Sequence, residues 1–434
     1  MAEVCRQGAN TLNTRKVPII FVPGVMGSRL YFPLVDQYWD PDSKWRMLHW
    51  VTASADDGRQ EMHWTMPAQV VAENKDLQPD RIKRGWAGVV TEFYVPFLTY
   101  LSGLTSLCAT TPVYAVGYDW RQTNRDSARM LGAQIDVILK AEKAENFILI
   151  SHSMGGIVCR ACLKQFSGLS GKLLGIVHLF QPVHGATVFY RRMYTGAISK
   201  IDGGFGLANI QGTTPSEFAT VLSALRGPCE LIPNDQYRDI RGADWLWDDR
   251  KTPPGPWTAA TAAGGSIFSW YLDPGGPPGV WWPVAGVKST WTPSPEADLK
   301  SRMNESKAFH DWLGEYRHPK TWAAYSTGLD TDMAVRFNNA KKNRGVQMQR
   351  RGQGDGTVPS TSGSALFPPE QTSTDGSGLA FLIDPNMKQF EVPDVEHSAA
   401  ANSAEVRTIV EKMLLVILGC VEPAPDTPAS AALA

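Results

Sequence analysis

"FILISHSMGGIVCR", residues 147–160, is the stretch of the sequence that decides the fold. It begins with an apolar run, breaks at Ser153 among small residues, and continues with apolar residues at helical spacing. A strand, a tight turn and a helix around x-Ser-x-Gly-Gly predict a nucleophile elbow, whose strained serine needs small neighbours at positions −2 and +2. Here these neighbours are Ser151 and Gly155. An incidental serine at an ordinary strand–helix junction is the alternative, and the strand before and the helix after favour the elbow.

Other short apolar runs repeat this pattern of a strand followed by a helix. Strands are predicted at 17–22, 112–118, 146–151, 172–180, 321–329 and 379–384, and helices at 127–142, about 155–166 and about 403–418. Ser127 is the expected N-cap of the first of these helices. Apolar strands that alternate with helices indicate an α/β fold, with a mostly parallel sheet and helices on both faces.

Two long segments interrupt the pattern and are predicted to be cap insertions. We expect one domain over residues 1–420, with insertions at about 30–85 and 190–320, and a disordered tail over 421–434. The second insertion shows few regular segments and is rich in Gly and Pro. It holds many of the 15 tryptophans, among them Trp245, Trp247, Trp257, Trp270, Trp281, Trp282 and Trp291. The insertions are interpreted as lids around an apolar cleft, with a rigid structural cover as the alternative.

Composition excludes several classes of protein. A formal net charge of −1 over 434 residues argues against a nucleic-acid partner. No run of 18 apolar residues predicts a transmembrane segment, although transient contact with a membrane surface is compatible with the sequence. The N-terminal residues lack the pattern of a signal peptide, so a cytoplasmic location is expected, with export without a signal peptide as the alternative.

The six cysteines do not indicate a metal site. They are scattered, apart from Cys159 and Cys162, which lie on the apolar-periodic segment after Ser153 and have no second pair with which to bind zinc. Two thiols packed within a helix are therefore expected. No metal and no organic cofactor is predicted.

A serine nucleophile needs a base that is held by an acid, and in hydrolases with this elbow the chain order is Ser, then Asp or Glu, then His. Of the eight histidines only His397 lies near the C-terminus, just before the last predicted helix. The candidate acid is Asp355 in "GQGDGTVPS", where flanking glycines let a loop present the carboxylate. Asp330 and Asp332, which follow a predicted strand, are rival acids.

Two backbone N–H groups are expected to bind the oxyanion. One is that of Met154, directly after the nucleophile, and the other should come from the loop after the first strand, "FVPGVMGS" (21–28). Val25 is the favoured donor in that loop and Met26 the alternate. His152 is interpreted as structural, with its side chain directed away from the substrate, and His184 as a supporting loop residue.

Taken together, the motifs resemble those of the lecithin:cholesterol acyltransferase and lysosomal phospholipase A2 family of α/β-hydrolases. The matching pieces stand in the family's order and span most of 17–418: "FVPGVMGS" (21–28), "GYDWR" (117–121), "HSMGG" (152–156), "LFQPVHGA" (179–186), "YSTGL" (325–329), "GDGTVP" (354–359) and "EH" (396–397). The chain departs from the secreted members in having no cysteine in 28–100, so their disulfide-closed lid is missing.

The resemblance implies an α/β-hydrolase fold with large cap insertions. It implies Ser153 as nucleophile, Asp355 as acid and His397 as base, and it decides against the two rival acids. It also implies that the N–H groups of Val25 and Met154 bind the oxyanion. The predicted activity is a serine esterase, lipase or phospholipase acting on lipid or bulky apolar esters through an acyl-enzyme. An acyltransferase that uses an alcohol acceptor, an exported antibacterial phospholipase and, last, a non-catalytic binding protein are the alternatives.

Overall fold

A parallel sheet forms the centre of the computed structural model, which describes residues 15–198, 204–239, 242, 244–257, 266–272, 282–289, 291–339, 346–374 and 386–420. Within these residues seven strands stand in the order β13-β14-β10-β7-β6-β1-β5, and all neighbouring pairs are parallel. The strands are β1 (Ile19–Val22), β5 (Val113–Ala115), β6 (Phe147–His152), β7 (Leu173–Leu179), β10 (Thr321–Thr327), β13 (Thr372–Ser373) and β14 (Gln389–Pro393). The predicted mostly parallel sheet is confirmed.

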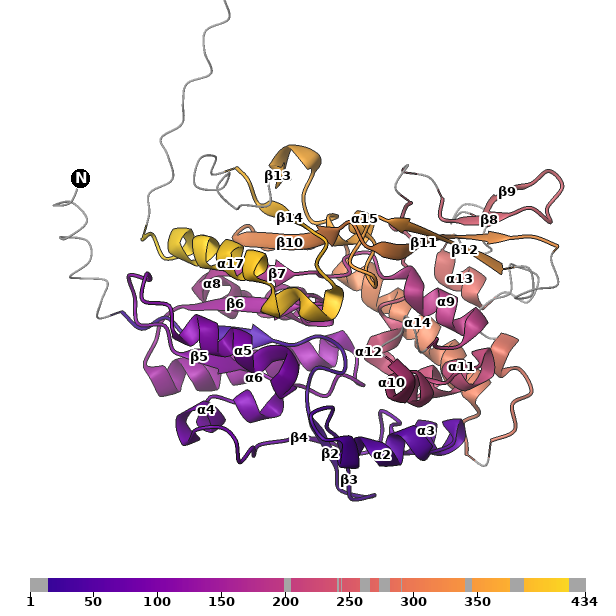
Figure 1. Ribbon diagram of the computed structural model, residues 1–434, viewed down its shortest axis with the longest axis horizontal. Helices are drawn as coiled ribbons and strands as arrows, with labels where there is room; N and C mark the ends of the chain where they lie inside the picture. Colours follow the sequence, from indigo (N-terminus) through magenta and orange to yellow (C-terminus); the bar gives the residue numbers. More distant parts are fainter. Residues whose placement is uncertain are drawn as a thin grey trace, which may run out of the picture.

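Helices cover both faces of this sheet, as its buried strands require. They are α5 (Thr91–Ser102), α6 (Asn124–Glu142), α7 (Met154–Gln165), α8 (Ser167–Lys172) and α17 (Ala404–Ile417). In β1, Ile20 and Val22 pack in the same apolar cluster as α6 and α7, while Ile19 and Phe21 pack with α5 and α17. This alternation follows from the two-residue period of a strand. Figure 1 shows α17, in yellow, lying along the sheet beside β7.

The predicted strands and helices that fall on described residues correspond to these elements, and one helix begins earlier than predicted. Helix α6 begins at Asn124 because Thr123, and not Ser127, caps it: the Thr123 side chain accepts a hydrogen bond from the N–H of Asp126. Ser127 is instead buried inside the helix. The predicted strand at 379–384 and the predicted tail at 421–434 lie outside the described residues.

The segment 190–320 is more regular than the sequence suggested. Its described residues, with those just before them, form α9 (Thr187–Thr195), α10 (Gly204–Gln211), α11 (Pro215–Ser223), α12 (Arg226–Cys229), β8 (Leu246–Asp248), β9 (Gly255–Trp257), α13 (Ile267–Tyr271), η3 (Trp282–Val284) and α14 (Pro295–Leu313). The expectation of few regular elements was wrong. Helix α11 begins with a capping box between Thr214 and Glu217, and α14 begins with Ser294 as N-cap and proline at its first position.

The segment 30–85 forms a small sheet and short helices. These are β2 (Leu30–Phe32), β3 (Gln37–Trp39), α2 (Lys44–Thr52), α3 (Ala55–Glu61), β4 (Gln69–Val70) and α4 (Pro79–Lys83), followed by η1 (Trp86–Gly88). Elements nearer the C-terminus are β11 (Asp330–Phe337), β12 (Val346–Gly352), α15 (Ser360–Gly363), η5 (Pro369–Gln371) and η6 (His397–Asn402). Strands β11 and β12 join β8 and β9 in a second sheet. That both segments are insertions into one domain stays a prediction.

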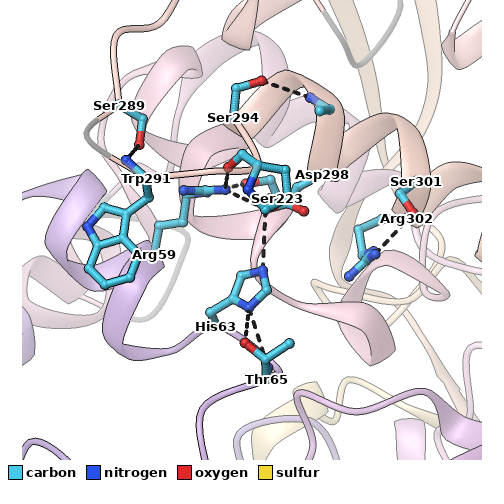
Figure 2. Close-up of polar contacts among 12 residues, drawn as sticks. Arg59, His63, Thr65, Ser223, Ser289, Trp291, Ser294, Asp298, Ser301 and Arg302 are labelled. Atoms are coloured by element: carbon cyan, nitrogen blue, oxygen red, sulfur yellow. Dashed lines mark hydrogen bonds and ion pairs between the residues drawn. The ribbon is translucent and has the colours of Figure 1, made fainter.

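The two segments are joined by a buried ion pair, which Figure 2 shows. Arg59 of α3 and Asp298 of α14 form it, and both side chains are almost fully buried. Arg59 Nε also donates to Ser223 Oγ of α11 at 3.2 Å, and His63 Nε2 lies 3.3 Å from Asp298 Oδ2. Helix α11 packs against both α3 and α14. These contacts fix the segment 30–85 against the segment 190–320.

Two observations concern the cysteines and the membrane. Cys108 and Cys420 form a disulfide, which the scattered cysteine pattern gave no reason to expect. Cys159 and Cys162 are buried free thiols on α7, as predicted.

In the described part of the chain, no helix combines the length and the apolar character needed to cross a bilayer.

Candidate active site

Ser153 lies at the sharp turn between β6 and α7. Its φ of 54° and ψ of −127° are a conformation that a residue with a side chain rarely adopts. The helix can turn away only because residue 155 is glycine, since a Cβ there would stand 2.4 Å from the carbonyl oxygen of Pro23. Ser151, at position −2, is small and buried, and its Oγ lies 2.7 Å from His178 Nδ1. The local structure is that of the predicted elbow.

The structure brings the three predicted side chains into one hydrogen-bonded chain. His397 Nε2 lies 2.8 Å from Ser153 Oγ, and His397 Nδ1 lies 2.7 Å from Asp355 Oδ2. Ser153 and Asp355 are buried, whereas the His397 side chain keeps 15% of its surface exposed. In this geometry Nδ1–H donates to the carboxylate, and Nε2 is free to accept the proton of the hydroxyl.

Asp355 is held in place by its own turn. Its Oδ1 accepts hydrogen bonds from the N–H groups of Thr357, at 2.9 Å, and Val358, at 2.6 Å, which leaves Oδ2 for His397. Gly356 has a φ of 85°, so the turn depends on a glycine at this position. The backbone N–H of His397 donates to the carbonyl of Asp355 at 3.0 Å, which ties the two loops together.

The rival acids lie elsewhere. Asp332 is buried in an ion pair with Arg191, whose Nε lies 2.6 Å from Asp332 Oδ2. Asp330 is exposed at the start of β11. The hydrogen bond to His397 is made by Asp355.

The loop after β1 lies against Ser153. A Cβ on Gly24 would stand 2.9 Å from Ser153 Cβ, so glycine permits this close approach. Val25 and Met26 line the same cavity as Ser153. The N–H of Met154 belongs to the first turn of α7, where N–H groups have no partner within the helix. The roles of Val25 and Met154 as oxyanion donors stay a prediction.

Sequence reasoning missed the surroundings of His152. His152 is buried beside Ser153, and both of its ring nitrogens bond to protein groups, which agrees with a structural role. The orientation of its side chain relative to a substrate stays a prediction. Burial, reinforced by His397, lowers the pKa of His152 to about 3, so its imidazole is neutral. Its Nε2–H donates to the backbone carbonyl of His397 at 2.9 Å. Nδ1 is therefore unprotonated and acts as an acceptor.

Tyr94 of α5 completes this arrangement. Its hydroxyl donates to His152 Nδ1 at 3.0 Å and accepts a hydrogen bond from the N–H of Gly24 at 3.2 Å. Tyr94 and His152 thus connect the loop after β1 to the backbone of His397. The sequence carried no signal for this contact, because Tyr94 and His152 are 58 residues apart and in different elements.

A cavity of about 400 Å³ opens above Ser153 and His397. Its lining comes from the loop after β1, from α2, α5, α9 and α10, and from the loop that holds Asp355, and it is mainly apolar. Apolar side chains that line it are Val25, Met26, Trp39, Met47, Val51, Phe93, Phe189, Ile210, Leu231 and Val358. The tryptophans of the 190–320 segment do not contribute to this lining among the described residues. The apolar wall comes mostly from aliphatic and phenylalanine side chains.

Parts of the chain are similar to known proteins in sequence and in fold. Residues 107–262 match the sequence model of the lecithin:cholesterol acyltransferase family. No curated protein matches the chain. A chain in the crystal structure of the Tle4–Tli4 complex is similar in fold, with a TM-score of 0.73 and 18% identity over 94% of this chain and 100% of that chain.

Two other solved structures show lower similarity. The lipase BlEst2 of Bacillus licheniformis has a TM-score of 0.33 and 11% identity, over 94% of this chain and 94% of that chain. The phospholipase PlaB of Legionella pneumophila has a TM-score of 0.24 and 14% identity, over 47% of this chain and 32% of that chain. The parallel sheet and the elbow at Ser153 are consistent with the match to this family model. Residues 107–262 are similar to the lecithin:cholesterol acyltransferase family, and the fold of the chain is that of an α/β-hydrolase.

Proposed function

We propose that this protein is a serine hydrolase that cleaves carboxylic esters carrying lipid or other bulky apolar groups. The observation that carries the proposal is the hydrogen-bonded chain Ser153–His397–Asp355 at the floor of a mainly apolar cavity. The match of residues 107–262 to the lecithin:cholesterol acyltransferase family supports a hydrolase or acyltransferase that acts on lipid esters.

The proposed reaction begins when Ser153 Oγ attacks the ester carbonyl while His397 Nε2 takes its proton. The carbonyl oxygen becomes an oxyanion, which the N–H groups of Val25 and Met154 bind. Asp355 holds the imidazole in the correct tautomer and stabilises the imidazolium that forms. When the tetrahedral intermediate collapses, His397 protonates the departing alcohol, and an acyl-enzyme on Ser153 remains.

Water completes the cycle. His397 removes a proton from the attacking water, and the acyl group leaves as a carboxylic acid. An alcohol that enters the apolar cavity competes with water for the acyl-enzyme, because His397 activates any hydroxyl that reaches it. We infer that hydrolysis is the main reaction and that transfer to medium-chain alcohols is a side reaction. The alternative is an acyltransferase, in which transfer to an alcohol is the main reaction. The apolar lining of the cavity is the observation in favour of this alternative.

Product analysis with a labelled acyl ester tests the choice between these outcomes. The reaction is run with purified protein in the presence and absence of a medium-chain alcohol or a sterol, with Ser153→Ala as the control. Free acid as the main product supports a hydrolase. Ester as the main product would make the protein an acyltransferase.

We further propose that the protein works outside the reducing cytoplasm. The disulfide between Cys108 and Cys420 supports this location, because disulfides persist mainly in oxidising compartments. Thiol counting on protein isolated from its own cells under alkylation tests it. Finding both cysteines reduced would instead support a cytoplasmic location.

A protein partner is also proposed, on the likeness to a chain solved in the Tle4–Tli4 complex.

A further inference from the structure

A second, polar cavity of about 330 Å³ lies on the other side of the loop that follows β7. Pro182 and Ala186 of this loop line the ester cavity, while Val183 and His184 line the second one. The remaining lining residues are Arg160 of α7, Gln236, Glu315, Arg317, Ala365 and Leu366. The proposed reaction uses none of these side chains.

Arg160 gives this cavity a buried positive charge. The residue is 3% exposed. Its Nε donates to the carbonyl of Tyr316 at 2.7 Å and its Nη2 to the carbonyl of Gly314 at 3.3 Å, both just beyond the C-terminal end of α14. These carbonyls position the guanidinium and carry no full charge with which to neutralise it. Buried charges normally have a partner of opposite sign, because their desolvation is costly.

Arg317 adds a second guanidinium at the rim of the cavity. It donates to the carbonyl of Leu366, and its guanidinium carbon lies 4.1 Å from the centre of the Phe367 ring, so its direction is fixed. Glu315 stands at the same rim and accepts a hydrogen bond from the Gln236 amide at 3.0 Å. Across the described residues, no carboxylate lies within ion-pair distance of Arg160 or Arg317.

Neighbouring groups respond to the charge of Arg160, which Glu315 of the same cavity attracts without forming an ion pair. The pKa of Arg160 is lowered to about 10, first by burial and then by repulsion from Arg317. The pKa of His184 is lowered to about 4, first by burial and then by Arg160, so its imidazole is neutral. A neutral imidazole has one N–H donor to offer and adds no charge.

We propose that this cavity binds a small phosphate anion, either inorganic phosphate or the headgroup of a phosphate monoester, between Arg160 and Arg317. Phosphate oxygens match the fork of a guanidinium, and an anion held between the two groups replaces their mutual repulsion by two charge-assisted contacts. Bound phosphate would also fix the loop 182–186, which separates this cavity from the ester cavity. The proposal does not depend on the function of Ser153.

Calorimetric titration of the full chain with inorganic phosphate, at constant ionic strength, tests the proposal. Saturable binding is expected, and it should weaken about tenfold or more in Arg317→Gln, which removes a charged contact from an exposed side chain. The matched control is Arg129→Gln, a change of the same charge on the exposed face of α6, which should leave binding unchanged. Arg160→Lys keeps the charge without the fork and should also weaken binding.

Further arms identify the source and the chemistry of the anion. Glycerol 3-phosphate should bind like inorganic phosphate, and acetate at the same ionic strength should bind at least about tenfold more weakly. Flotation with phosphatidic acid vesicles measures binding of the protein to a lipid phosphate headgroup. Vesicle binding that is lost in Arg317→Gln would assign the site to a phospholipid rather than to a free phosphate. Absence of binding to every phosphate probe at millimolar concentration, or equal binding by wild type, Arg317→Gln and Arg160→Lys, would overturn the proposal.

Discussion

His152 donates a hydrogen bond from Nε2 to the backbone carbonyl of His397 at 2.9 Å, so the residue before the proposed nucleophile holds the residue that activates it. On its other side His152 accepts a hydrogen bond from Tyr94, which in turn binds the N–H of Gly24. One neutral imidazole therefore fixes His397 relative to the loop after β1. A displacement of about 1 Å in such a site costs about 10²-fold in rate.

His152→Ala should accordingly lower kcat by about 10²-fold while KM changes little, because the substrate still enters the same cavity. His152→Gln, which keeps an N–H donor, should recover part of this loss. The measurement is steady-state hydrolysis of a soluble ester. His178→Gln serves as the control, since His178 is equally buried and contacts Ser151 but not His397. Equal losses of kcat in His152→Ala and His178→Gln would mean that His152 affects the activity only through the stability of the fold.

Removing a member of the proposed triad should abolish most of the activity. Ser153→Ala and His397→Ala should each cost on the order of 10⁶ in kcat, and the double variant should cost little more, because the two groups act as a unit. Asp355→Asn should cost about 10⁴, since the imidazole then loses its correct tautomer. Asp332→Asn should leave kcat near the wild-type value in protein that remains folded. An inactive Asp332→Asn beside an active Asp355→Asn would show that the acid is misassigned.

Breaking the ion pair between Arg59 and Asp298 should destabilise the protein. Arg59→Ala leaves a carboxylate buried beside His63, which we expect to lower the free energy of unfolding by about 3–5 kcal/mol. Replacing both partners, in Arg59→Met/Asp298→Leu, should recover most of this loss. Denaturant unfolding measures both. A loss below about 0.5 kcal/mol in the single variant would show that the segments 30–85 and 190–320 are not coupled through this pair.

Stability should decrease in mildly acidic solution. Burial is the first cause that lowers the pKa of His152 and His178 to about 3, and of His184 and His310 to about 4. Their pKa in the unfolded chain is about 6.5. The unfolded state therefore binds more protons between these values, and the free energy of unfolding falls as the pH drops from about 6.5 toward 4.

Each such histidine contributes a slope of roughly 1 kcal/mol per pH unit within this window. The check is denaturant unfolding at several pH values, with His178→Gln as the variant that should reduce the slope. A free energy of unfolding that is constant between pH 7 and pH 4 would contradict the burial of these groups in neutral form.

The sequence predicted those parts of the site that depend on local structure. The elbow at Ser153 follows from its glycines and the apolar strand before it, and the Asp355 turn follows from Gly356. Other contacts depend on elements that only the tertiary fold brings together. Tyr94 and His152, Arg59 and Asp298, and Cys108 and Cys420 are each separated by tens to hundreds of residues. No local pattern marks such pairs.

The helices of the segment 190–320 were missed for a different reason. Helices α10 and α14 are only weakly amphipathic, and the clearer pattern of α9 and α11 was outweighed by the glycines, prolines and tryptophans of the segment. Capping signals were nevertheless present at Thr214 and Ser294. Ser or Thr followed by proline indicates the N-terminus of a helix even where the helical spacing of apolar residues is weak.

The identity of the nucleophile is the central claim, and active-site labelling tests it most directly. Purified protein is treated with a fluorophosphonate probe, and the modified peptide is mapped by mass spectrometry, with Ser153→Ala and His397→Ala as controls. We predict one label per chain, located on Ser153, with no label in Ser153→Ala and a greatly slowed reaction in His397→Ala. A label on a different residue, or ester hydrolysis by a protein whose Ser153 remains unmodified, would contradict the proposed function.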